Sequence, residues 1–273
     1  MSAANHQPKR TALLTGATGA IGAAIATQLA QQPDLALILV VRDRARGARL
    51  CDQISRQTGN RNVRFELADL SLRASIRALA KRLDQPLHVL INNAAEAPRQ
   101  RLETAEGLER QFATNVMGYF WMIREFEPRL MQSAPARIVN VASYWAGDLD
   151  LLDLQFTRRR YDNDTAYRQS KQADRLLTVW FAHRLSASGV TVNACHPGDV
   201  NSKLSNDLGF FGHQSPDEGA RTPFFLATDP GLEGVTGKYF ADCTEVACEF
   251  GSNGQAVEAL ATACLEIDRE LGD

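Results

Sequence analysis

The sequence predicts an α/β fold in which a parallel sheet of about seven strands lies between two layers of helices. Short β-branched or leucine-rich runs alternate with longer amphipathic stretches through the first 200 residues, which is the pattern of repeated βα units. Several runs are apolar at consecutive positions, as in Leu37–Val41, and this indicates strands that are buried on both faces. The helices are therefore expected to cover both sides of the sheet.

The expected elements follow one another in βα order, with glycine and proline between them. The expected strands are Thr11–Thr15, Ala36–Val41, Val63–Leu67, Val89–Asn92, Arg137–Ala142 and Val190–Cys195, with a seventh at Gly237–Phe240. The expected helices are Ile21–Gln31, Ala45–Gln57, Leu72–Leu83, Leu108–Met131 and Thr165–Ser188, and Gln255–Leu271 closes the chain. No linker divides these elements, so we expect one domain over residues 1–273, with residues 1–9 flexible.

The composition excludes several classes of protein. Apolar residues make up 44% and charged residues 23% of the 273 positions, which suits a globular domain with a continuous core. The formal net charge of −2 gives no large positive field, so no nucleic-acid partner is expected, and Arg158–Arg160 is interpreted as a solvated surface turn. No apolar run is long enough to span a bilayer, and the first ten residues lack the apolar stretch of a signal peptide.

The five cysteines form no regular framework. An odd number of scattered cysteines is typical of reduced thiols, so we expect a cytoplasmic protein. Cys243 and Cys248 would bind a metal only if histidines joined them in space, and none is near in the sequence. No metal site is therefore expected.

A glycine-rich turn, TGATGAIG at residues 15–22, follows the first strand and opens the first helix. Because glycine has no Cβ, such a turn lets backbone N–H groups and a helix N-terminus approach the pyrophosphate of a dinucleotide. A purely structural tight turn is the alternative. The place of the glycine-rich turn in the first βα unit favours a doubly wound Rossmann domain with a dinucleotide site.

Arg42 stands directly after the second expected strand. An NAD enzyme would place a carboxylate here against the ribose 2′-hydroxyl, whereas a guanidinium favours a 2′-phosphate through charge-assisted hydrogen bonds. NADP(H) is therefore the predicted cofactor. The alternative is a surface arginine near Arg44 and Arg46, with Asp43 reaching the ribose.

Tyr167 and Lys171 are four residues apart on the longest expected helix, so they share one of its faces. The unperturbed pKa of a tyrosine phenol is about 10, and a nearby ammonium group lowers that pKa towards a range useful for acid–base catalysis. The same spacing alone describes many ordinary exposed pairs. Together with the glycine-rich turn and Arg42, however, this spacing indicates a catalytic pair.

Seven ordered segments together resemble the short-chain dehydrogenase/reductase family along nearly the whole chain. They are TGATGAIG at 15–22, ADL at 68–70, NNAA at 92–95, Asn115, VASYWAG at 141–147, YRQSK at 167–171 and HPGDV at 196–200. The resemblance implies that Tyr167 exchanges a proton with the substrate oxygen and that Ser143 hydrogen-bonds this oxygen. It implies that Lys171 lowers the pKa of Tyr167 and holds the nicotinamide ribose, and that Asn115 supports a water-linked proton path to Lys171.

The same resemblance implies a cofactor site that gathers residues from most of the loops after the strands. The implied cofactor contacts are Gly16, Thr18, Gly19, Ile21, Gly22, Arg42, Asp69, Leu70, Asn93, Ala94, Ala95, Tyr167, Lys171, Pro197, Gly198, Val200 and Ser202. Among them, Asp69 and Leu70 would lie at the adenine and Asn93–Ala95 along the adenosine ribose. Pro197, Gly198 and Val200 would lie beside the nicotinamide carboxamide, with Ser202 replacing a threonine that is common in the family.

The sequence departs from the family pattern at three points, and these bear on the residue roles that the resemblance implies. The glycine spacing resembles that of longer family members, and NNAA replaces NNAG, so Ala95 has to accept whatever backbone angles a glycine would have served. Ser143 and Tyr167 lie 24 positions apart, about twice the separation in compact members, because of an extra segment that ends at Asp164.

The extra segment, HPGDV and residues 233–240 resemble the retinol-dehydrogenase-like and WW-domain-oxidoreductase-like branch of the family. This resemblance implies a lipophilic or aromatic carbonyl or alcohol as substrate, with NADP(H) as cofactor. It also implies homo-oligomers built through the helices at 108–131 and 165–188, although the branch includes monomers.

Residues near the expected nicotinamide site are candidates for the substrate pocket. The segment Asn201–Ser215 mixes glycines with Leu204, Leu208, Phe210 and Phe211, so it is either an apolar lid or a helix packed on the sheet. Tyr144 and Trp145 are either a substrate wall or core residues. His196 precedes Pro197 and is interpreted as a structural residue that makes a turn hydrogen bond.

The predicted function is an NADP(H)-dependent oxidoreductase, such as a carbonyl reductase, that acts on a small lipophilic or aromatic molecule. A dinucleotide-sensing regulator with the same fold but no turnover is the alternative from another class, and the joint presence of Ser143, Tyr167 and Lys171 argues against it. Epimerases and dehydratases are suggested only by the glycine spacing, and the chain lacks their usual extra length.

Overall fold

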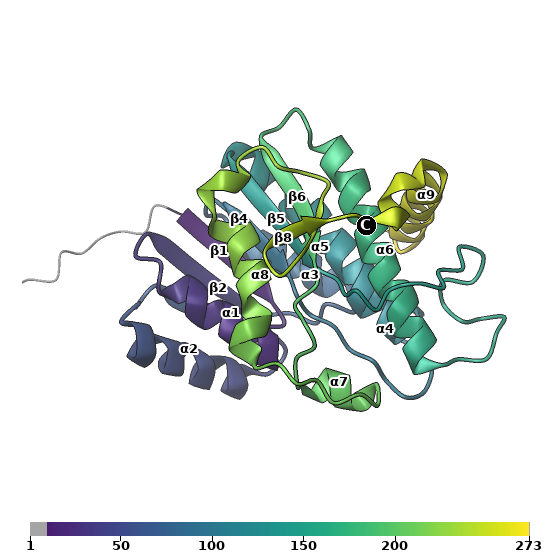
Figure 1. Ribbon diagram of the computed structural model, residues 1–273, viewed down its shortest axis with the longest axis horizontal. Coiled ribbons are helices and arrows are strands. Elements are labelled where there is room, and N and C mark those ends of the chain that lie inside the picture. The colour runs from purple at the N-terminus through teal and green to yellow at the C-terminus, as the bar shows by residue number, and fades with distance from the viewer. Residues whose placement is uncertain (1–9, 273) are drawn as a thin grey trace, which may run out of the picture.

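An eight-stranded sheet runs through the protein in the order β3-β2-β1-β4-β5-β6-β7-β8 (Figure 1). The computed structural model describes residues 10–272, so the flexibility expected for residues 1–9 falls outside it. The strands are β1 (Arg10–Thr15), β2 (Leu35–Val41), β3 (Val63–Leu67), β4 (Val89–Asn92), β5 (Ala136–Val141), β6 (Val190–Cys195), β7 (Tyr239–Ala241) and β8 (Thr244–Val246). The first seven pair in parallel, which confirms the predicted parallel sheet.

The last strand was not predicted. β8 pairs with β7 in antiparallel orientation, and its three residues are all exposed. Such a strand has no buried side and therefore no alternation of apolar and polar residues to reveal it. The expected seventh strand is also displaced, because β7 begins at Tyr239 and not at Gly237.

The strand order reverses at β1, which lies between β2 and β4. The connections therefore leave β1 and β4 in opposite directions, and a crevice opens beyond the carboxyl ends of these two strands. In open α/β sheets this switch point is where ligands bind. The glycine-rich turn follows β1 and the NNAA segment begins in β4, so both lie at this edge.

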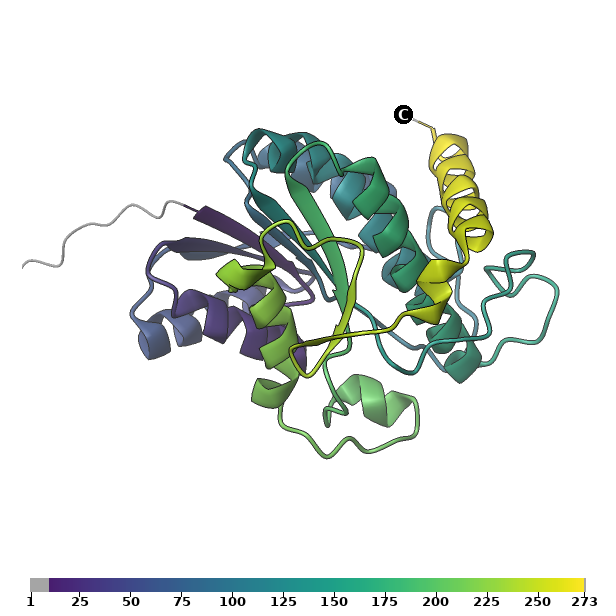
Figure 2. The same ribbon diagram turned by 45° about the horizontal axis from the view of Figure 1, so that its top comes forward.

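Helices cover both faces of the sheet, as predicted, and Figures 1 and 2 show α8 beside α1 and α9 beside α6. The helices are α1 (Ala20–Ala30), α2 (Arg44–Thr58), α3 (Arg73–Arg82), α4 (Arg110–Phe112), α5 (Gly118–Gln132), α6 (Asn163–Arg184), α7 (Lys203–Asp207), α8 (Pro216–Thr228) and α9 (Gly254–Glu270). Successive side chains of β1 alternate between the layers: Leu14 belongs to the buried cluster that includes residues of α1 and α8, and Leu13 to the cluster that includes residues of α3, α5, α6 and α9.

The helix expected over Leu108–Met131 is interrupted. A short α4 passes into a π-helical stretch, Ala113–Met117, before α5 begins at Gly118. All five residues of this stretch are buried. Insertions of this kind are concentrated at functional sites, and this one contains Asn115.

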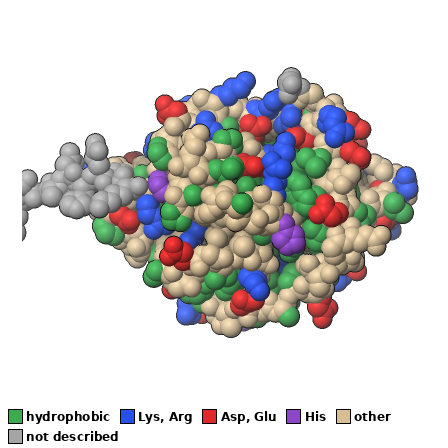
Figure 3. All heavy atoms as spheres, turned by 90° about the horizontal axis from the view of Figure 1, so that it is seen from above, with side chains coloured by type: hydrophobic (Ala, Val, Ile, Leu, Met, Phe, Trp, Pro, Cys, Tyr) green, Lys and Arg blue, Asp and Glu red, His purple; other side chains and the backbone are tan. Residues whose placement is uncertain are grey.

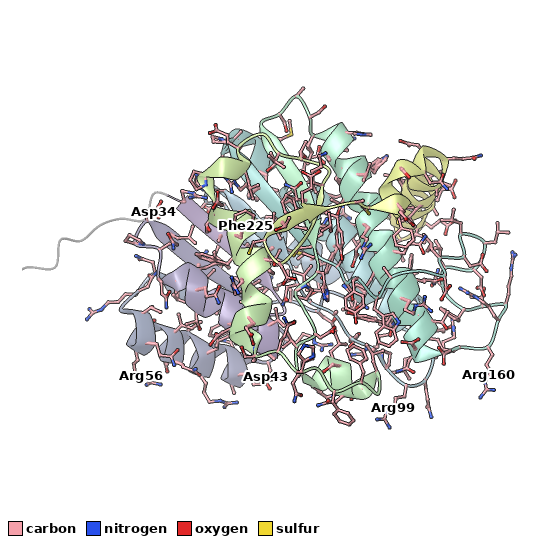
Figure 4. All side chains as sticks on the ribbon, viewed as in Figure 1. Asp34, Asp43, Arg56, Arg99, Arg160 and Phe225 are labelled. Atoms are coloured by element: carbon pink, nitrogen blue, oxygen red, sulfur yellow. The ribbon has the colours of Figure 1, made fainter. Side chains whose placement is uncertain are left out.

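The extra segment between β5 and α6 is organised by a buried carboxylate. Asp153 is 4% exposed and accepts hydrogen bonds from the backbone N–H groups of Thr157 (2.7 Å) and Arg159 (3.1 Å). Arg159 also pairs with Asp153 at 3.3 Å and lies 4.2 Å from the centroid of the Phe156 ring. The prediction of a solvated turn is therefore wrong for Arg159, whereas Arg160 points away from the protein (Figure 4).

The surface carries charges of both signs. Figure 3 shows acidic and basic side chains interspersed on the face viewed from above. Between residues 10 and 272, no helix combines the length and apolar character that a membrane span needs. In the same range, no three or more histidine, cysteine or acidic side chains gather as metal ligands would.

Replacement of Asp153 tests the order of the extra segment. We expect Asp153→Ala to lower the free energy of unfolding by about 1 to 3 kcal/mol, because buried backbone N–H groups lose their acceptor. Denaturant titration measures this loss, and hydrogen exchange at Thr157 and Arg159 should speed up. Asp52→Ala, at an exposed position of α2, is the control. Equal stability and exchange in the two variants would contradict the role of Asp153.

Candidate active site

The glycine-rich turn is held against β4 by side-chain hydrogen bonds. Thr15 Oγ1 accepts hydrogen bonds from the backbone N–H groups of Asn93 (2.9 Å) and Ala94 (3.2 Å). The Asn93 side-chain amide donates in return to the carbonyl oxygens of Thr15 (3.0 Å) and Gly16 (3.3 Å). The Asn93 side chain therefore fixes the turn, and the predicted place of Asn93 along the adenosine ribose stays a prediction.

Two of the three glycines in this turn are required by the fold itself. Gly16 has a φ of +66°, and a Cβ there would lie 2.7 Å from the Ala94 Cα. A Cβ on Gly22 would lie 2.3 Å from the carbonyl oxygen of Gly16. These glycines let the chain turn tightly enough to bring the start of α1 to the crevice.

The third glycine leaves the start of α1 open. Gly19 is exposed, has an extended backbone conformation and supplies no side chain to cap α1. By contrast, Asp43 caps α2 and Asp162 caps α6 through their carboxylates. An uncapped N-terminus with exposed N–H groups suits a phosphate, so the turn fits a dinucleotide pyrophosphate. Thr18 and Ile21 flank this N-terminus and are both partly exposed.

The residues implied at the adenosine lie at the same edge of the sheet. The Asp69 carboxylate is partly exposed and accepts hydrogen bonds from the backbone and side chain of Ser71. The side chain of Leu70 is buried in the core, so only its backbone remains for a nucleotide. Ala95 does not have a positive φ, so it can replace the usual glycine without backbone strain.

Arg42 lies at the end of β2 with 54% of its side chain exposed, and its guanidinium pairs with Glu96 at 3.4 Å. Arg46, from the first turn of α2, donates to the carbonyl oxygen of Thr18 in the glycine-rich turn at 2.9 Å. Figure 4 places Asp43, between these two arginines in the chain, at the end of α2 opposite Arg56. Two guanidinium groups therefore border the turn on the side where the second strand ends.

Ser143, Tyr167 and Lys171 come together where β5 ends and α6 passes over it. Their exposed fractions are 7%, 7% and 1%. The Ser143 hydroxyl oxygen accepts a hydrogen bond from the backbone N–H of Trp145 at 3.0 Å, and Ser143 lines the same pocket as Tyr167. The structure thus brings together the three residues that the sequence motifs predicted.

Lys171 is held by two hydrogen-bond acceptors near the Tyr167 phenol. Its Nζ donates to the carbonyl oxygen of Val141 at 3.0 Å and to Asp174 Oδ2 at 2.9 Å, and it lies 5.9 Å from the Tyr167 ring centroid. The phenol of Tyr119, on α5, donates to the same Val141 carbonyl at 3.2 Å. The ammonium group is therefore fixed in position by β5 and α6 together.

The electrostatics of the site differ from the simple expectation. Burial raises the pKa of Tyr167 above its usual value, and Lys171 and Ser143 offset only part of this rise. Burial alone would lower the pKa of Lys171, but Asp174 and the two neighbouring phenols raise it, so Lys171 stays protonated. In the cofactor-free protein the Tyr167 phenol therefore stays protonated at neutral pH.

Asn115 is bound on both sides of its amide. Its Oδ1 accepts from the backbone N–H of Glu96 at 2.9 Å, and its Nδ2 donates to the carbonyl oxygen of Glu96 at 3.0 Å and to Ser170 Oγ at 3.1 Å. The Asn115 side chain thus ties α6 to the loop after β4. It makes no direct contact with Lys171 among these bonds, and the predicted proton path remains a prediction.

A pocket opens in front of Ser143 and Tyr167. Aromatic and apolar side chains line it on two sides: Trp145 stacks on Phe210 with 4.8 Å between ring centroids, and Leu204 and Leu208 lie beside them. Leu204, Leu208 and Phe210 belong to residues 203–210, here called the α7 segment, and this segment lines the pocket as the predicted lid would. Phe211, also predicted for the lid, is 80% exposed. Tyr144 also faces the pocket and is 53% exposed, which excludes the alternative that it fills the core.

The loop after β6 forms the remaining wall. Pro197, Gly198, Val200 and Ser202 all line the pocket, and their contact with the nicotinamide carboxamide stays a prediction. The Ser202 hydroxyl also caps α7 by accepting from the Ser205 backbone N–H at 3.1 Å. A Cβ on Gly198 would lie 2.1 Å from Gln214 Oε1, so this glycine lets the Gln214 side chain close the loop.

His196 lines the pocket but does not make the predicted turn hydrogen bond through its ring. Its backbone N–H donates to Phe240, whereas its buried Nδ1 has no hydrogen-bond partner within residues 10–272. The ring meets Tyr144 edge-on, with 4.5 Å between centroids. Burial lowers the pKa of His196 to about 4, so the imidazole is neutral at neutral pH.

Sequence reasoning missed two charged residues beneath the site. Asp174 is 1% exposed and Arg175 is 8% exposed. Arg175 donates to the backbone carbonyl of Ser143 and to the Tyr239 hydroxyl, and it lies 3.7 Å from the Tyr239 ring centroid. Asp174 follows Lys171 by three positions, a spacing that puts both on one helix face and was the available signal.

Comparison with known proteins agrees with this geometry. A family model for short chain dehydrogenases matches residues 10–209. Retinol dehydrogenase 13 of Mus musculus is 36% identical over 260 residues, which cover 88% of this chain and 78% of that protein.

Two solved structures share the fold. An uncharacterized protein from Mycobacterium paratuberculosis superposes with a TM-score of 0.79 at 28% identity, over 98% of this chain and 97% of that one. The RhlG/NADP active-site complex from Pseudomonas aeruginosa gives a TM-score of 0.67 at 26% identity, over 88% of this chain and 97% of that one.

Gly19 is the position at which to test phosphate binding. A Cβ there would meet only the Gly16 carbonyl oxygen, at 3.4 Å, so Gly19→Val should fold and weaken NADPH binding by about tenfold or more. Fluorescence titration with NADPH measures the affinity. Gly254→Val, at the open start of α9, is the control and should bind normally. Equal affinities would exclude the start of α1 as the phosphate site.

Proposed function

This chain belongs to the short-chain dehydrogenase family, in its retinol-dehydrogenase-like branch, and we propose that it is an NADP(H)-dependent oxidoreductase of a lipophilic or aromatic carbonyl or alcohol. The family consists of oxidoreductases that use a nicotinamide dinucleotide and act on CH–OH and C=O groups. Membership of the family does not establish the cofactor preference, the substrate class or the roles of single residues. These are the parts that we propose.

The observation that carries the proposal is the buried cluster of Ser143, Tyr167 and Lys171 at one wall of an apolar pocket. NADPH, when bound, supplies the hydride that reduces the carbonyl carbon. Tyr167 donates its phenolic proton to the carbonyl oxygen as the hydride arrives, and Ser143 donates a hydrogen bond that orients this oxygen. In the oxidation direction the Tyr167 phenolate accepts the proton from the alcohol.

Lys171 supports this proton transfer without leaving its place. Its ammonium group favours the phenolate form of Tyr167 and retains one donor position beyond the two that Val141 and Asp174 occupy. That third donor is available for the nicotinamide ribose. Arg175, on α6, donates a hydrogen bond to the backbone carbonyl of Ser143 and so holds the backbone at Ser143 against α6.

NADP(H) is proposed over NAD(H) because of Arg42 and Arg46. Arg42 stands where the second strand ends, and Arg46 already contacts the glycine-rich turn. A 2′-phosphate between them would receive charge-assisted hydrogen bonds. Glu96, the present partner of Arg42, would share this guanidinium or release it. The NADP complex of the structurally similar RhlG from Pseudomonas aeruginosa supports the same preference.

The substrate is proposed to be lipophilic or aromatic because of the pocket wall. Tyr144, Trp145 and Phe210 present ring surfaces to the space in front of Tyr167, and these favour apolar or aromatic contacts over charged ones. The name of the similar mouse protein, retinol dehydrogenase 13, points to the same chemical class. A retinoid itself is not assumed.

Arg42→Asp tests the cofactor preference. The change removes the proposed phosphate partner and adds a like charge, so NADPH should weaken relative to NADH by about tenfold or more. Calorimetric titration with both dinucleotides gives the ratio. Arg56→Asp makes the same charge change at the far end of α2 (Figure 4) and should preserve the preference. An unchanged ratio in Arg42→Asp would remove this residue from the cofactor site.

Tyr167→Phe tests the enzyme against a dinucleotide sensor that performs no turnover. Loss of the hydroxyl should leave NADPH binding nearly intact and slow hydride transfer by ~10² to 10⁴, the usual contribution of a positioned acid. A panel of ketones and aldehydes identifies a substrate, and loss of NADPH absorbance in a single turnover measures the rate. Tyr161→Phe, in the extra segment, is the matched control. A parent-like rate in the Tyr167 variant would contradict the mechanism.

A further inference from the structure

A carboxylate is buried next to the ammonium group that serves the proposed acid. Asp174 is 1% exposed, and its Oδ2 accepts a hydrogen bond from Lys171 Nζ at 2.9 Å. Its other oxygen, Oδ1, has no hydrogen-bond partner within residues 10–272. A carboxylate with one unsatisfied oxygen is expensive to bury, so its position is not explained by stability alone.

The groups around Asp174 come from three helices. Lys171 pairs with it from its own helix, α6, and the negative charge of Asp174 raises the pKa of Tyr167 on α6, of Tyr119 on α5 and of Cys264 on α9. Arg175, the next residue, turns away towards Ser143 and Tyr239. Lys171 is therefore the cation that Asp174 neutralises, and Tyr167 is the acid within reach of this pair.

The charge balance decides what Lys171 can do to Tyr167. An ammonium group without a counter-ion would favour the phenolate strongly in a buried site, because the surroundings screen charge poorly. Asp174 offsets that effect, and its own negative charge disfavours the phenolate directly. Burial raises the pKa of Asp174 to about 6, so the carboxylate is largely ionised at neutral pH.

We propose that Asp174 is a positioning residue that holds Lys171 in a buried ion pair and, by offsetting its charge, keeps Tyr167 protonated as the proton donor for carbonyl reduction. The inference deepens the proposed function and rests on it for the direction of catalysis. The proton equilibrium involved is Tyr–OH giving Tyr–O⁻ and a solvent proton, with Lys171 remaining an ammonium group. The equilibrium between carbonyl and alcohol is unchanged, and only the pH ranges of the two directions move.

The sign of the effect of Asp174→Asn follows from this balance. The variant keeps the size of the side chain and an oxygen that accepts from Lys171, but it removes the negative charge. The ammonium group then acts on Tyr167 without an offset, and the phenol should lose its proton at a pH about one unit lower. Alcohol oxidation should begin at lower pH, and carbonyl reduction should decline at lower pH.

Ultraviolet difference spectroscopy of tyrosinate measures this titration in the cofactor-free protein. For each form, the same form carrying Tyr167→Phe is the blank, so the signal belongs to Tyr167 alone among the five tyrosines. A rapid pH jump takes the reading before alkaline unfolding. Asp174→Glu restores the charge and should return the titration towards that of the parent. Asp268→Asn is the control. It removes a carboxylate of α9 that pairs with Arg73, and it should leave the titration of Tyr167 unchanged.

The outcomes separate this proposal from the proposed function. A lowered Tyr167 titration in Asp174→Asn, with recovery in Asp174→Glu, supports the role of Asp174. An unmoved or raised titration overturns it, and so does a shift of equal size in Asp268→Asn. None of these readings requires catalysis. Failure of the proposed function would appear separately, as parent-like turnover in Tyr167→Phe.

Discussion

The position of the Lys171 ammonium group is the constraint on which the rest of the site depends. Its Nζ is fixed by the Val141 carbonyl at the end of β5 and by Asp174 one helical turn further along α6, at 3.0 and 2.9 Å. The first contact ties α6 to the end of β5, and Tyr167 lies one turn before Lys171 on the same helix. Ser143 follows β5 directly, so the same crossing brings the serine and the phenol together. Tyr119 from α5 shares the Val141 carbonyl and closes the cluster from the other side.

The proposed dinucleotide site and the substrate pocket both adjoin this cluster. The glycine-rich turn is fastened to β4 through Thr15 and Asn93, which leaves the uncapped start of α1 open at the switch point of the sheet. The α7 segment lies across the pocket, where Phe210 stacks on Trp145. A dinucleotide at the first and an apolar molecule at the second would have their reacting ends beside Tyr167. The fold therefore fixes the position of Tyr167, and residues of the loops line the pocket beside it.

The sequence predicted the layers, seven of the strands to within about two residues, and that Ser143, Tyr167 and Lys171 lie together, because these leave regular signals: buried apolar runs, helical spacing and glycine turns. Other features depend on tertiary packing. β8 has only exposed side chains, and the π-helical stretch around Asn115 keeps the apolar pattern of an ordinary helix. The role of Asn93 in bracing the turn was not predicted, because it requires knowing that β4 lies beside β1. Asp174 and Arg175 read as solvated charges until α6 is seen to be buried on that face.

The central claim is that the cluster transfers a hydride across a carbonyl and does not merely bind a dinucleotide. Single-turnover reaction with NADPH that carries deuterium at the reactive nicotinamide carbon tests it most directly, with mass spectrometry of the products from a panel of apolar and aromatic aldehydes and ketones. The account predicts that at least one of them gains one deuterium on the carbinol carbon, and that Tyr167→Phe slows this gain. Tight NADPH binding with no deuterium in any product would contradict the account and favour a sensor of the dinucleotide.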